Sequence, residues 1–77
     1  MSIYYFDFQV GSKSVERDDN GLEFESSDLA KMDAAKALLE FARDRAAVAL
    51  DLNDEISLHV RNQTGHLCTL VVTLVVQ

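Results

Sequence analysis

The chain is 77 residues long, with 13 acidic and 7 basic residues and a formal net charge of −6. A chain of this length forms one domain, with room for one sheet and one helix but little for a deep substrate pocket. The negative charge opposes phosphate backbones and anionic lipid headgroups, so we expect no nucleic acid and no membrane among its partners.

A single cysteine, Cys68, excludes an intrachain disulfide. The opening residues have neither the basic start nor the apolar run of a signal peptide. The longest apolar stretch, residues 67–76, is rich in β-branched residues and too short to span a bilayer as a helix. We therefore expect a cytoplasmic protein.

Residues 3–10 predict a strand, because they are aromatic and β-branched with a period of two. Tyr4, Phe6, Phe8 and Val10 share the face that we expect to meet the core. The opposite face carries Ile3, Tyr5, Asp7 and Gln9.

Two turns follow. Residues 11–14 form the first, after which residues 15–17 can pair back as a short strand. The second turn covers residues 18–21 and ends in Asn-Gly, a strong turn signal. Residues 22–24 are expected to be extended.

A helix is predicted from residue 29 to about residue 49, because this stretch is rich in alanine and lacks Gly and Pro. Ser26, Ser27 and Asp28 are all suitable N-caps. At 100° per residue the polar face comprises Asp33, Lys36, Glu40, Arg43 and Asp44. The broadly opposite face, comprising Ala34, Leu38, Phe41, Ala42 and Ala49, can lie close on a sheet.

The remaining residues predict a hairpin of strands 55–62 and 66–77. A two-residue loop would align the apolar face of the first strand with Thr69, Val71 and Thr73. A three-residue loop, residues 63–65, aligns it with the more apolar face of Cys68, Leu70, Val72 and Leu74. We favour the latter, which pairs Val60 with Cys68 and His59 with Thr69. It also places His59 and His66 on opposite faces.

The last strand is apolar on both faces, although one helix can cover only one. Left open at an edge, such a strand promotes aggregation. We therefore expect a second copy of the chain to cover it, which predicts a homodimer. The candidate interface residues are Ile3, Tyr5, Leu67, Val71 and Val75.

Tests for chemistry predict no catalytic residue, cofactor or metal site. The segment from Glu16 to Gly21 is spaced like the start of a calcium loop, but Ser27 stands where a bidentate Glu is required. A zinc site would need both histidines together. Cys68 is interpreted as a small core residue and Asp7 as a charge that guards the sheet against mispairing.

Several motifs together resemble a family of short bacterial proteins known as a domain of unknown function. They are the Tyr-Tyr-Phe-Asp strand (Tyr4 to Asp7), the Asp-x-x-Gly turn (Asp18 to Gly21), the Ala-rich helix and a strand ending in a glycine turn (Arg61 to Gly65). The resemblance covers nearly the whole chain and implies no activity. The order of elements is also loosely similar to antitoxin domains of the HicB type.

We thus expect one α+β domain over residues 1–77. It should have a mostly antiparallel sheet of about four strands, one long helix on one face, and the order ββαββ. The predicted function is a non-enzymatic protein-interaction or regulatory module. One alternative is an antitoxin-like module that neutralises a basic protein. Another is a small-ligand binder or enzyme, for which a pocket lined by Asp7, His59 or the acidic turn would be evidence.

Overall fold

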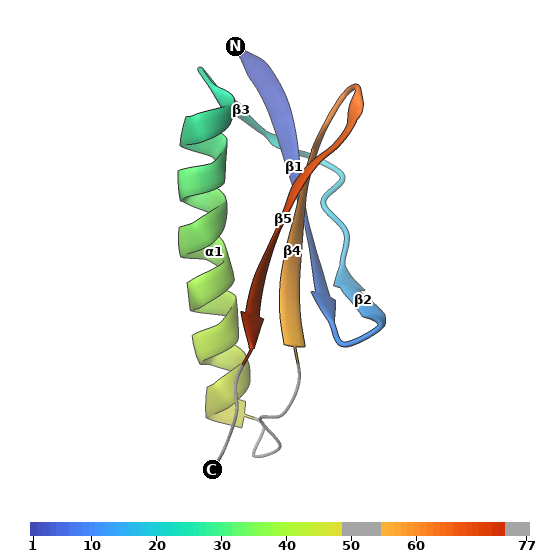
Figure 1. Cartoon of the computed structure of the whole chain (residues 1–77), viewed down its shortest axis with the longest axis vertical. Helices are drawn as coiled ribbons and strands as arrows, with labels where there is room; N and C mark the ends of the chain where they lie inside the picture. Colours follow the sequence, from blue (N-terminus) through green and yellow to red (C-terminus); the bar gives the residue numbers. More distant parts are fainter. Residues whose placement is uncertain (49–54, 74–77) are drawn as a thin grey trace.

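The computed structural model describes residues 1–48 and 55–73. Five strands and one helix follow in the order β1 (Ser2–Val10), β2 (Lys13–Glu16), β3 (Leu22–Phe24), α1 (Ser27–Val48), β4 (Glu55–Asn62) and β5 (Gly65–Thr73). The strands form one antiparallel sheet in the order β2-β1-β4-β5, and α1 lies along one side of it (Figure 1). The predicted α+β fold and element order are confirmed.

β1 is flanked differently at its two edges. One edge pairs with β4 along most of its length. The other pairs with β3 near Ile3 and with β2 near Gln9. Phe6 lies between these two short pairings, where neither strand reaches it. The loop between β2 and β3 crosses the edge of the sheet at this point.

The core lies between α1 and the inner face of the sheet. Its buried residues are Tyr4, Phe6, Ala30, Ala34, Leu38, Ala42, Ile56, Leu58 and Val60. Phe24 of β3 packs on the rings of Tyr4 and Phe6, with centroids 5.9 and 6.0 Å away, and Phe41 stacks on Phe8 at 4.4 Å. The inner face predicted for β1 is therefore confirmed.

The helix begins as its sequence indicates. Of the three predicted caps the structure uses Ser26, whose Oγ accepts a hydrogen bond from the Leu29 N–H at 3.2 Å. Alanines allow α1 to lie close against β4 and β5, which it contacts more than β1. Ala49, expected on the inner face, lies outside the described residues. No helix in the described part of the chain combines the length and apolarity needed to cross a membrane.

The final hairpin has the predicted register over most of its length, with Val60 opposite Cys68 and His59 opposite Thr69. Nearer the turn, however, Arg61 pairs with His66. Leu67 is thus an extra residue on β5, which makes a β-bulge. A bulge reverses the alternation of side chains beyond it. The β5 residues between Cys68 and the turn therefore lie on the opposite face of the sheet from the one that simple alternation predicts.

The bulge corrects two predictions. Leu67, expected on the outer face, is half-buried and packs against the core. His66, expected to point away from His59, lies on the same face, with the two ring centroids 6.0 Å apart. The predicted three-residue loop also shortens, because Gly65 already pairs with Asn62. Gly65 has a positive φ of 131°, which favours glycine at this position.

Candidate functional site

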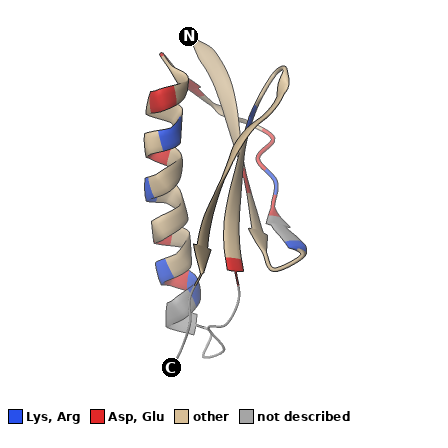
Figure 2. Ribbon diagram, viewed as in Figure 1, with Lys and Arg blue, Asp and Glu red and all other residues tan. Residues whose placement is uncertain are grey.

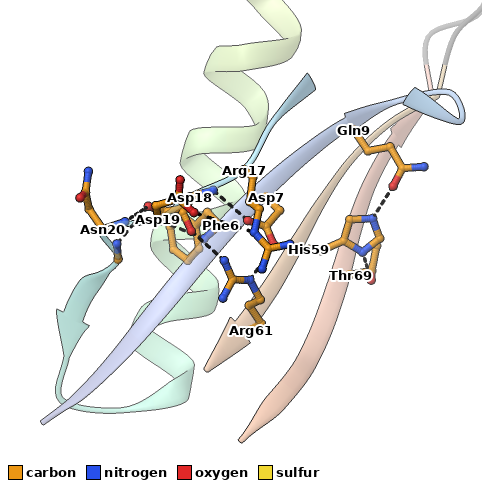
Figure 3. A network of polar contacts seen from close by, with 11 residues as sticks. Phe6, Asp7, Gln9, Arg17, Asp18, Asp19, Asn20, His59, Arg61 and Thr69 are labelled. Carbon is orange, nitrogen blue, oxygen red and sulfur yellow. Dashed lines mark hydrogen bonds and ion pairs between the residues drawn. The ribbon is translucent and has the colours of Figure 1, made fainter. Parts of the chain in front are cut away.

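A network of charged side chains lies on the outer face of the sheet, away from the helix (Figure 3). Asp7 on β1 and Arg61 on β4 meet there, with the Arg61 Nε–H donating to Asp7 Oδ2 at 2.8 Å. The guanidinium also lies over the ring of Tyr5, 4.4 Å from its centroid, in a cation–π contact. Both charged side chains are about one-quarter exposed or less, so this pair is better shielded than an ordinary surface ion pair.

The same network holds the loop between β2 and β3 against the sheet. Asp7 Oδ1 accepts a hydrogen bond from the Asp18 N–H at 2.9 Å, and the Asp18 carbonyl accepts one from Arg61 at 2.7 Å. The loop is thus fixed at Asp18 by two residues that are 11 and 43 positions away in the sequence.

The Asp18 carboxylate is fully engaged with backbone donors. Its Oδ1 accepts from the N–H groups of Asn20 and Gly21, at 3.1 and 3.0 Å, and forms the turn. Its Oδ2 accepts from the Phe6 N–H at 3.1 Å. This last bond replaces the strand partner that β1 lacks between β2 and β3.

The pKa values of both carboxyl groups reflect these bonds. Burial raises the pKa of Asp7, but the Arg61 hydrogen bond, the Asp18 N–H and the charges of Arg61 and Arg17 outweigh it and hold the value below its usual range. Burial and the nearby Asp7 charge raise the pKa of Asp18. The hydrogen bonds from its three backbone donors lower the pKa by more, so the value lies below its usual range. Both side chains are therefore ionised at neutral pH. The hydrogen bond to Asp7 likewise raises the pKa of Arg61.

Gly21 closes the turn against β1. Its φ is +73°, and a Cβ atom there would lie 2.5 Å from Ile3 Cγ2 and 2.9 Å from a ring carbon of Tyr5. No other residue fits this position without displacing β1 side chains. The opening strand and the Asp-x-x-Gly turn therefore form a single structural unit.

A second row of polar groups crosses the outer face beside the first. His59 Nε2 lies 2.9 Å from Gln9 Oε1, so this nitrogen carries a proton and donates it. In the neutral ring Nδ1 then accepts from the Thr69 hydroxyl at 3.1 Å. The same hydroxyl oxygen lies 2.8 Å from Nε2 of His66 and accepts from it. The row runs from β5 to β1.

The predicted interface residues have different surroundings in the structure. Ile3 and Tyr5 are half-buried and border Gly21, and Leu67 faces the core. Val71 is 50% exposed on the outer face. Val75 lies outside the described residues. The outer face is consequently more polar than the sequence analysis indicated.

The calcium-like turn uses its oxygens for structure. The Asp18 carboxylate is occupied by backbone N–H groups in a tight turn. Within residues 1–48 and 55–73, no three His, Cys, Asp or Glu side chains are grouped closely enough to hold a metal ion. Cys68 is half-buried opposite Val60 and packs against the core.

Residues 3–74 match the family described as a domain of unknown function, DUF6894. The chain belongs to this family. Comparison with curated proteins and with solved structures finds no match. The DUF6894 match covers every described strand and the helix except for Ser2 at the start of β1, so the Asp7–Arg61–Asp18 network lies wholly within the family domain.

Sequence reasoning did not find the partner of Asp7. Arg61 is 54 positions away, and only the β1–β4 register places Tyr5 opposite Arg61 and Asp7 opposite His59. One signal was available: the outward positions of β1 and β4 carry opposite charges, Asp7 and Arg61. Opposite charges on neighbouring strands of one face are a common pairing.

Proposed function

We propose that this domain is a non-enzymatic protein-interaction module that forms a homodimer through the free edge of β5. The main support is the combination of an open edge and the absence of charge along it. Within the described residues β5 pairs with β4 alone. Residues 62–77 contain no Asp, Glu, Lys or Arg, and β5 is uncharged in Figure 2.

Edge strands of natural sheets are usually protected by charges, prolines or coverage. β5 has a bulge near its turn and no charged side chain beyond it. The opposite edge of the sheet carries Lys13 and Glu16 on β2. The two edges therefore differ in the way expected if β5 pairs with another chain and β2 does not.

Charge also favours the β5 edge as the meeting place of two copies. Each chain has a net charge of −6, so two copies repel over most of their surfaces. In Figure 2 the charged residues lie on α1, around β2 and at a few points of β1 and β4, whereas β5 itself carries none. Antiparallel pairing of β5 with a second β5 about a two-fold axis joins the least charged parts of both molecules.

The helix provides a second contact for this arrangement. Phe41 lies on the side of α1 that faces β1, because its ring stacks on Phe8. At 100° per residue, Met32 and Leu39 lie about 140° to 160° around α1 from buried Ala34, on its outer surface and on the side away from Phe41. Both are more than 60% exposed. In a β5–β5 dimer the two helices would lie side by side on one continuous sheet and cover these residues.

The catalytic alternatives receive less support from the polar groups in the described chain. Asp7, Asp18 and Arg61 hold the loop to the sheet, and His59 bridges Gln9 and Thr69. These bonds have a structural purpose, and an enzymatic site needs groups positioned for a substrate.

Sedimentation velocity from about 5 to 500 µM tests the proposal, a range that spans the micromolar affinities of weak homodimers. We expect wild-type protein to shift from monomer to dimer. Val71→Asp and Leu39→Asp should each remain monomeric, because a two-fold axis places two new carboxylates near each other. Leu29→Asp is the matched control, since Leu29 is 46% exposed but lies on the side of the outer helix surface nearer Phe41. A folded wild-type chain that stays monomeric throughout would refute the dimer.

A further inference from the structure

A hollow of about 420 Å³ opens between the loop that follows β2 and the inner face of β1. The apolar residues of its lining are Phe6, which is 9% exposed, Phe8 and the exposed Leu22. Residues 16–21 form the rest of the lining. The volume lies within the range of small-molecule pockets, which also combine aromatic walls with a few polar groups.

The fold explains why this space is not filled. Asp7 and Arg61, both on the outer face, hold the loop backbone at Asp18. Gly21 packs against Tyr5 on that same face. The loop is thus drawn toward the outer side of the sheet, and a hollow remains between it and the β1 edge. The helix does not close the space, because it packs mainly over β4 and β5.

The charge around the hollow is negative. Three carboxylates, of Glu16, Asp18 and Asp19, are opposed by one guanidinium, that of Arg17. Arg17 Nε lies 3.9 Å from Asp19 in a highly exposed ion pair, which provides little stability. The carboxylates of Asp18 and Asp19 belong to residues that line the same hollow as Phe6. A positive charge is therefore favoured next to an aromatic surface.

We propose that this hollow binds a small organic cation with an apolar body, of the arylalkyl-amine class. The apolar body lies against Phe6, Phe8 and Leu22, and the ammonium group lies between Glu16 and Asp19. The site is distinct from the free edge of β5, so it does not depend on dimer formation.

A ligand series with one ring and three charges tests the site by NMR titration of ¹⁵N-labelled protein. The probes are 2-phenylethylamine, 2-phenylethanol and phenylacetate, which are cationic, neutral and anionic. We expect shift changes in the amides of residues 6, 8 and 16–22. The amine should bind roughly two- to fivefold more tightly than the alcohol, the range that one exposed ion pair provides. Phenylacetate should bind most weakly.

Charge-neutralising variants locate the cation. Glu16→Gln and Asp19→Asn should each bring the affinity for the amine close to that for the alcohol, while binding of the alcohol stays the same. Glu40→Gln, on exposed helix surface, is the matched control and should leave the order of affinities unchanged. Repeating the titration with Val71→Asp separates this site from the proposed dimer.

Two outcomes would overturn the proposal. One is the absence of localised shifts with any probe at millimolar concentration. The other is equal affinity for 2-phenylethylamine and phenylacetate, which would show that the negative lining does not discriminate between cationic and anionic ligands.

Discussion

The Asp18 carboxylate accepts a hydrogen bond from the Phe6 backbone N–H at 3.1 Å, at the point where β1 has no strand beside it. A side chain thus provides the acceptor that a neighbouring strand would normally supply. Because the same carboxylate also binds the N–H groups of Asn20 and Gly21, one residue stabilises both the strand edge and the turn.

Asp18→Ala should therefore destabilise the fold more than its partial exposure indicates. Three backbone donors lose their acceptor, and we expect the free energy of unfolding to fall by about 2 kcal/mol. Urea denaturation followed by circular dichroism measures this. Asp19→Ala is the control: its side chain is 84% exposed, and its loss should cost about 0.5 kcal/mol or less. Equal costs for the two variants would contradict the role given to Asp18.

Gly21→Ala should be much more costly than Gly11→Ala. Both glycines have positive φ, at +73° and +58°, so both substitutions carry backbone strain of roughly 1 kcal/mol. Only at Gly21 does the new Cβ meet Ile3 and Tyr5 at less than 3 Å. We expect an additional loss of about 1–3 kcal/mol from this overlap. Thermal unfolding of the two variants side by side isolates the steric term.

Acid should weaken the fold through Asp7 and Asp18. Their native pKa values lie below the ordinary value of about 3.9, so the unfolded chain takes up protons first. The stability they provide is complete above the ordinary value and is lost as the pH falls through the lower native values. Urea unfolding between pH 7 and pH 2.5 should show this decline.

Asp18→Asn should flatten the acid decline, because the amide does not titrate. Glu40→Gln serves as the reference and should retain the wild-type slope. If Asp18→Asn loses stability with acid as steeply as wild type, the lowered pKa of Asp18 is not a source of the pH dependence.

The β-bulge predicts unequal effects at two apolar residues of β5. Leu67 packs against the core, so Leu67→Ala should lower the free energy of unfolding by about 1–2 kcal/mol. Val71 is half exposed, and Val71→Ala should change it by about 0.5 kcal/mol or less in the monomer. Denaturation at low micromolar concentration makes this comparison. Reversed effects would indicate regular alternation without the bulge.

The sequence was sufficient for everything that depends on local pattern. Alternation of apolar residues identified β1 and β4 with their correct faces, and alanine content with N-cap residues identified α1. The Asn-Gly signal located the turn before β3. Matching apolar faces across the hairpin also gave the pairing of Val60 with Cys68. The first three follow from neighbours in the chain. The Val60–Cys68 pairing was predicted with a three-residue loop, whereas the structure reaches it with a shorter loop and a bulge at Leu67.

The candidate site was less accessible from sequence for two physical reasons. A bulge inserts one residue into a strand without a distinctive residue type that would mark it in the sequence. Alternation alone therefore did not indicate that Leu67 faces the core and that His66 lies on the same face as His59. The partner of Asp7 depends on which strands are adjacent. β1 and β4 are separated by the helix in the chain, and their register is decided by core packing on the other face.

Local residue chemistry by itself thus determined that this is a small acidic α+β domain with an uncharged last strand. Only the tertiary structure decided that Asp7, Asp18 and Arg61 act together, that the loop they hold leaves a hollow beside Phe6 and Phe8, and that β5 is the free edge. These features arise from contacts between residues 11 to 54 positions apart, which exist only once the sheet has closed around its core.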